Sequence, residues 1–144
     1  MASVFDVAAY LLEKCGSMTH MRLQKLIYYS QAWSLVWDEK PLFNDKIEAW
    51  ANGPVVPSLA SKLKGRFRVN KNHLDKGAAS NLTPAQRDTI NGVLDFYGHR
   101  DAQWLSDLTH MEAPWREARK GLAPGERGQQ EISHASLAEY YGSL

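Results

Sequence analysis

The stretch HMRLQKLIYYSQAWSLVW at residues 20–37 decides the fold, because it predicts one long helix with apolar side chains on nearly every side. Thr19 can cap its first turn, and Asp38 and Pro41 turn the chain after its last. Lys25 is the only charged residue from residue 23 to residue 37. A helix of this kind is covered all round, either by the core or by a partner protein. We therefore expect the other elements to pack around it.

Helix signals lie on both sides of this segment. Capping residues precede apolar-periodic runs, as at Ser3 and at Thr83 with Gln86, and proline stands at first helical positions, as at Pro84. The segments that carry such signals are residues 4–15, 57–65, 84–98, 101–110, 113–121 and 134–144. We predict a mainly α fold, a compact single-domain bundle of about six helices.

Residues 41–57, PLFNDKIEAWANGPVVP, follow no helical period. We expect a short strand or hairpin around residues 46–51. Asn52 and Gly53 mark a turn after it, and Pro57 suits the first position of a short helix. The prolines push the residues before them toward an extended backbone, so the stretch is a stiff corner. It is either architecture alone or a rigid surface for a partner, and we favour the surface slightly.

The composition fits one domain, residues 1–144, at the usual ~100–200 residues per domain. Cys15 is the only cysteine, so the chain can form no internal disulfide, which suits a reducing compartment. The start MASVFDVAAYLLEKCG has no basic region before its apolar run, and no segment approaches the ~18 apolar residues of a membrane span. We expect a cytoplasmic protein with no membrane partner.

The sequence shows no catalytic or metal-binding constellation. Its five histidines are scattered, and it contains no HExxH, P-loop, G-x-S-x-G or GxGxxG motif. The nearest approach is THME, in which His110 and Glu112 point to different sides of a helix, and we interpret both as structural hydrogen-bonding residues. We therefore expect no enzyme activity and no cofactor.

A basic segment runs from Lys62 to Lys76, although 17 basic and 16 acidic residues give the whole chain a net charge of only +1. With Phe67 between its charges, the segment could follow a phosphate backbone or an acidic protein surface. Charge runs usually lie in water, so we interpret it first as a solvated loop. We expect no nucleic-acid partner.

Several blocks, in order along nearly the whole chain, resemble the Panacea antitoxin domain, also called SocA-like or phage-associated GepA-like. The blocks are LQKLIYYSQAW (23–33), PLF (41–43), IEAWANGPVVPSLA (47–60), WLSDLTHMEAPWREAR (104–119) and ISHASLAEYY (132–141). The resemblance implies a small, mainly helical antitoxin, encoded beside a toxin in bacteria or their phages, that neutralises this toxin by direct binding. Other readings stay open: an adaptor that delivers the toxin to a ClpXP-type protease, as one family member does, or a nucleic-acid-binding regulator that uses Lys62–Lys76.

The resemblance does not say which residues touch the toxin. Loop residues on a rigid scaffold often carry binding, and tryptophans are enriched at interfaces. Since five tryptophans are many for this length, we expect at least one to face a partner. The expected partner-binding residues are Trp50, Asn52, Pro54, Val55, Val56, Trp115 and Arg119.

Overall fold

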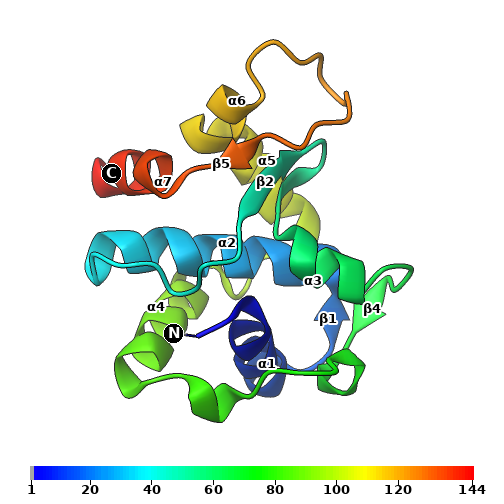
Figure 1. The fold of residues 1–144 in the computed structure, drawn as a ribbon, viewed down its shortest axis with the longest axis vertical. Helices are drawn as coiled ribbons and strands as arrows, with labels where there is room; N and C mark the ends of the chain where they lie inside the picture. The colour runs from blue at the N-terminus through cyan, green and yellow to red at the C-terminus, as the bar shows by residue number, and fades with distance from the viewer. Residues whose placement is uncertain (1) are drawn as a thin grey trace.

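Helix α2 (His20–Trp37) lies at the centre of the computed structural model, which describes residues 2–144. Figure 1 shows it crossing the molecule, with α1 (Val4–Cys15) and α4 (Pro84–Tyr97) on one side and α5 (Ala102–Met111) and α7 (His134–Gly142) on the other. Two short helices, α3 (Pro57–Lys62) and α6 (Ala113–Ala118), complete the seven α-helices among the described residues. The predicted mainly α fold is confirmed, and α2 is its core.

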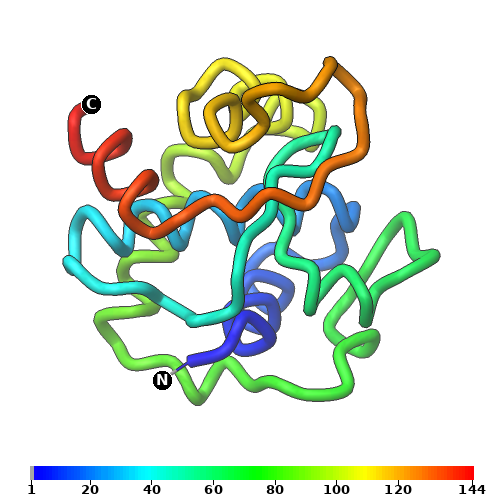
Figure 2. Tube along the Cα trace, turned by 45° about the horizontal axis from the view of Figure 1, so that its top comes forward, coloured from blue at the N-terminus to red at the C-terminus, as the bar shows by residue number. Residues whose placement is uncertain are grey.

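The strands form two small antiparallel sheets. In one, β1 (Met18–Thr19) pairs with β4 (Arg68–Val69); in the other, β2 (Ile47–Trp50) lies between β3 (Gly53–Val55) and β5 (Glu131–Ile132). Glu48 pairs with Val55 across the hairpin and with Glu131 on the other side. Figure 2 shows the orange C-terminal segment running beside this hairpin. The hairpin expected around residues 46–51 is therefore confirmed, and β5 closes its outer edge.

The predicted caps position the helices. The Thr19 side chain accepts a hydrogen bond from the Arg22 amide, and Thr83 and Gln86 form a complete capping box at the start of α4. Between β4 and α4 the chain makes only two 3-10 turns, Lys71–His73 and Ala79–Asn81. Such local bonds use backbone donors that have no partner inside the helix.

Buried polar side chains on α2 fix the chain that follows it. The Gln31 Oε1 atom accepts hydrogen bonds from the Leu42 amide (2.7 Å) and the Phe43 amide (3.2 Å), and its Nε2 atom donates to the Phe43 carbonyl (2.8 Å). The Ser34 hydroxyl donates to the Lys40 carbonyl. These bonds pair the amides of Leu42 and Phe43 and the carbonyl of Phe43, and they fix the connection beside α2 before it leads into β2.

The aromatic residues are shared between core and surface. Tyr29 stacks on Tyr97 at 4.1 Å between ring centroids, and the partly buried Trp33 donates its indole N–H to the Tyr97 hydroxyl. Trp37 is 51% exposed and Trp104 is 40% exposed. None of the helices formed by residues 2–144 has the length and apolar character needed to cross a membrane.

Candidate functional site

Two side chains of α2 form hydrogen bonds to the backbone of the β2–β3 hairpin and of the residue that follows it. The Lys25 ammonium donates to the Pro54 carbonyl at 3.0 Å, and the Gln24 Oε1 atom accepts from the Val56 amide at 2.9 Å. Both side chains are buried. The Leu-Gln-Lys-Leu run of the central helix is thus bonded directly to the Gly-Pro-Val-Val-Pro corner.

Helices α5 and α6 hold the same hairpin from the opposite side. The Ser106 hydroxyl donates to the Asn52 carbonyl at 2.6 Å, and the Trp115 indole N–H donates to the Trp50 carbonyl at 2.8 Å. Arg119, just after α6, donates to the Ala49 carbonyl at 3.0 Å. Backbone groups from residue 49 to residue 56 are therefore fixed by side chains from three helical segments.

Gly53 is required at the turn for two reasons. Its φ is +121°, a region that L side chains rarely adopt. A Cβ atom at this position would lie 2.7 Å from the Lys25 Cε atom. The close approach of the Lys25 side chain to the turn thus depends on glycine.

A pocket of about 330 Å³ opens between α2, the hairpin and the loop after α6. Its lining consists of His20, Met21, Gln24, Lys25, Trp50, Ala51, Asn52, Val55, Ala60 and residues 127–129. A second, shallower hollow shares His20, Trp50, Ala60 and Arg127 with it and adds Lys64. No Asp or Glu of the described chain lines either one, so the ionisable side chains of the two linings are all basic.

Lys25 forms part of the inner wall of this pocket. It is only 1% exposed, and burial lowers its pKa to about 7. Burial, and secondly the charge of Lys25, also lowers the pKa of His20. Groups with perturbed pKa values that line a cavity are typical of functional sites, although structural networks perturb them too.

Arg119 connects the hairpin to the loop that closes the pocket. Its guanidinium is buried and donates to the carbonyls of Ala49 and Glu126. This loop presents Arg127 and Gly128 to the pocket. Arg119 therefore bonds to both strand β2 and the loop at residue 126, and it fixes these two parts of the pocket relative to each other.

His110 and Glu112 lie behind the hairpin. The His110 ring stacks on the Trp115 ring at 4.0 Å, and its Nε2 atom is buried without a hydrogen-bond partner in the described structure. Glu112 accepts hydrogen bonds from the hydroxyls of Tyr29 (2.6 Å) and Tyr141 (2.7 Å). Glu112 thus makes the expected hydrogen bonds, whereas the Nε2 atom of His110 makes none within the described residues. Among residues 2–144, no cluster of three His, Cys, Asp or Glu residues is placed to hold a metal ion.

The structure brings the predicted partner-binding residues together around the hairpin, in two layers. Trp50, Asn52 and Val55 line the pocket, and Val55 is itself buried, with 9% of its surface exposed. The other four lie behind this surface: Pro54, Val56 and Arg119 are buried, and Trp115 is half-buried on the Trp50 carbonyl. In this conformation those four support the surface, and a partner-binding role for any of the seven stays a prediction.

Sequence reasoning missed several pocket residues, notably Gln24, Lys25 and Arg127. The lone charge of Lys25 in an apolar helix was the available signal, because a buried amine needs a nearby polar partner. Its partner is a backbone carbonyl, and every residue type has one, so the sequence does not indicate which residue supplies it. Arg127 lies in a loop with no periodic pattern, so nothing in the sequence pointed to it.

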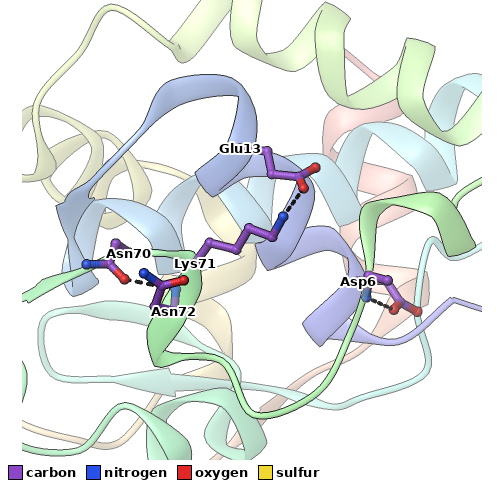
Figure 3. A network of polar contacts seen from close by, with 6 residues as sticks. Asp6, Glu13, Asn70, Lys71 and Asn72 are labelled. Carbon is purple, nitrogen blue, oxygen red and sulfur yellow. Dashed lines mark hydrogen bonds and ion pairs between the residues drawn. The ribbon is translucent and has the colours of Figure 1, made fainter.

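The basic segment is largely engaged within the molecule. Lys62 pairs with Asp75 at 3.1 Å and Lys71 pairs with Glu13, as Figure 3 shows for the latter. Arg68 donates to the Ser17 carbonyl, and the Lys76 ammonium lies 4.5 Å from the centre of the Phe5 ring. Four of its six cations, all except Lys64 and Arg66, therefore have contacts inside the chain.

Comparisons with known proteins converge on one family. A family model described as antitoxin SocA-like, Panacea domain, matches residues 23–116. Antitoxin SocA of Caulobacter vibrioides (strain NA1000 / CB15N) is 30% identical over 124 residues, an alignment that covers 76% of this chain and 66% of that protein. This chain therefore spans just under two thirds of the length of its relative. No solved structure matches significantly.

The matched region begins on α2 and ends on α6, so it contains Gln24, Lys25, the hairpin, Ser106 and Trp115. It covers well over half of the 144 residues. The matched range thus includes residues of α2, α5 and α6 that bond to the hairpin, and the chain belongs to the family of antitoxin SocA-like proteins with a Panacea domain.

Proposed function

We propose that the chain is an antitoxin that neutralises a toxin protein, encoded nearby, by binding it directly through the surface around the hairpin pocket. The family match supports the antitoxin role. The observation that carries the location is the two-sided bonding of the hairpin by Lys25, Ser106 and Trp115. A surface that is already rigid loses little conformational entropy when a partner binds it.

The chemistry of the pocket suits a protein contact. The half-buried Trp50 and the largely buried Val55 line it with apolar groups, and the exposed Asn52 adds a polar side chain at the rim. Interface hot spots combine a large aromatic side chain with a pocket that excludes water. The pocket volume of about 330 Å³ accepts one or two side chains of a partner.

Co-expression with the neighbouring gene tests the role. We expect the wild-type chain to restore growth to cells that express the neighbouring toxin. Asn52→Glu should reduce this rescue, because it places a bulkier, charged side chain at the pocket rim. Asn44→Glu, the same change at another exposed asparagine, is the matched control and should rescue fully.

Two results would redirect the proposal. If the toxin remains lethal beside abundant, folded chain, the antitoxin role is wrong. If rescue disappears only in cells that lack a ClpXP-type protease, the chain is an adaptor for degradation and direct neutralisation is wrong. Full rescue by Asn52→Glu would move the contact surface away from the pocket.

A further inference from the structure

The pocket beside the hairpin is lined by basic side chains at different depths. Lys25 lies in its inner wall with 1% exposure, His20 lines its side, and Arg127 lies exposed on the loop that closes it. Lys64 extends the same charge into the adjoining hollow. With no carboxylate in the lining, these groups have no counter-ion within the pocket.

The bonding of Lys25 is incomplete for a charged amine. An ammonium group has three donors, and among residues 2–144 the Lys25 Nζ atom has one hydrogen-bond partner, the Pro54 carbonyl. A buried cation without a paired anion is unfavourable, and an anion that enters the pocket relieves this cost. The inner wall therefore favours a carboxylate over a neutral group.

The remaining lining indicates what carries this anion. Met21, Trp50 and Val55 form apolar walls, which suit the methylene groups of a side chain. A phosphate is bound in proteins mainly by several converging N–H donors, whereas here the inner wall supplies one amine, Arg127 supplies one guanidinium, and the walls between them are apolar. The lining matches an acidic side chain better than a phosphate group.

We infer that the pocket receives an aspartate or glutamate side chain of the toxin, with its carboxylate toward Lys25 and Arg127 and its methylene groups against Met21, Trp50 and Val55. This inference rests on the proposed function, and it specifies the chemistry of the partner at that site. It also makes Lys25 and Arg127 determinants of which toxin is recognised.

Charge changes on the chain test the inference by titration calorimetry with the purified toxin. Arg127→Glu reverses the rim charge on an exposed side chain and should weaken binding at least ~10-fold, with a slower association. Lys25→Met keeps a similar volume without the charge and should weaken binding ~30-fold or more. Lys120→Glu changes the net charge equally at an exposed site outside the pocket and should bind within about twofold of wild type.

Proton uptake gives an independent readout. Because burial holds the Lys25 pKa at about 7, much of its amine is neutral at pH 8, and a carboxylate beside it restores the proton. His20 on α2 and His110 on α5, which also face it, have lowered pKa values and are neutral at this pH, and Arg127 stays charged. Binding at pH 8 should take up a proton in wild type and not in Lys25→Met, as calorimetry in two buffers measures.

A scan of the toxin identifies the anchor. Each surface Asp or Glu of the toxin is changed to Asn or Gln, and one position should show non-additive binding losses with Arg127→Glu. If wild type does not bind the toxin, the proposed function itself fails. If wild type binds, but Arg127→Glu behaves like Lys120→Glu and no acidic position couples to it, the inference is overturned while the antitoxin role stands. Competition by inorganic phosphate alone, without such coupling, also overturns it and assigns the pocket to a free anion.

Discussion

Lys25 is a single amine in the apolar surface of α2, bonded to one backbone carbonyl. A leucine at this position would fill the space without desolvating a charge, so the lysine is costly for stability. What it adds is a specific contact, because no other atom of α2 bonds to Pro54 among the described residues. Its titration makes this cost measurable.

The stability of the wild-type protein should rise by about 2 kcal/mol between pH 7 and pH 9, because of Lys25. Burial lowers the folded-state pKa to about 7, whereas an ordinary lysine has 10.5. In that range the unfolded chain binds more protons than the folded one, and unfolding becomes less favourable as pH rises. Urea titrations at several pH values measure the free energy of unfolding.

Lys25→Met should remove this rise, while Lys64→Met, at an exposed lysine, should retain it. A wild-type stability that stays flat from pH 7 to pH 9 would show that Lys25 keeps an ordinary pKa, in contradiction to its burial.

Glu112 is the acceptor that pairs the phenol groups of Tyr29 and Tyr141 in the core. Glu112→Ala should lower the free energy of unfolding by ~3 kcal/mol, because buried hydroxyls lose their acceptor. Glu112→Gln keeps a carbonyl oxygen in place and should cost less than half as much. Equal losses in chemical denaturation would show that the carboxylate acts through charge and not as a hydrogen-bond acceptor.

At the scale of elements, the hairpin β2–β3 is the point where the family blocks meet. Gln24 and Lys25 of α2 bond to the backbone of residues 54 and 56, and Trp115 and Arg119 bond to the backbone of residues 49 and 50. The turn glycine is the residue on which this arrangement depends.

Gly53→Ala should destabilise the protein more than Gly65→Ala. Both glycines have positive φ, so each alanine carries a backbone cost of ~1–2 kcal/mol. Only at Gly53 does the added Cβ meet Lys25, and shifting that side chain loses its bond to Pro54, a further ~1 kcal/mol. The Cβ at Gly65 meets no atom within 4 Å. Similar melting temperatures for the two variants would show that the hairpin and the Lys25 side chain move apart without a loss of stability.

The basic segment should not bind nucleic acid at physiological salt. Four cations have contacts within the chain: Lys62, Arg68, Lys71 and Lys76. In the part of the chain that the structure describes, the side chains of Lys64 and Arg66 have none. Proteins that bind DNA non-specifically usually neutralise more phosphates, ~6–10 of them in strong cases. We expect the chain to elute from immobilised duplex DNA below ~150 mM salt. Retention above that, lost in Lys64→Glu with Arg66→Glu, would restore the regulator hypothesis.

At the scale of the whole molecule, local patterns predicted the elements and only the structure related them. Thr19, Thr83 and the run of apolar residues on α2 gave the helices, because caps and periodicity are local properties. The pocket was not predictable, because it depends on side chains that reach across more than 25 residues to backbone atoms, as Lys25 does to Pro54. The sequence predicted a rigid corner at Asn52 and Val55, but not that Arg127 lies beside it. Arg127 lies there because Arg119 bonds to the Glu126 carbonyl and β5 pairs with β2, and both interactions fix the last loop next to the hairpin.

Direct binding of the toxin is the central claim, and titration calorimetry with the two purified proteins tests it without protease, nucleic acid or other cell components. We expect saturable binding at a fixed stoichiometry, weakened at least ~10-fold by Asn52→Glu at an unchanged melting temperature. If the folded chain and the active toxin give no heat of binding and elute separately in gel filtration, while the chain still rescues growth in cells, direct neutralisation is contradicted.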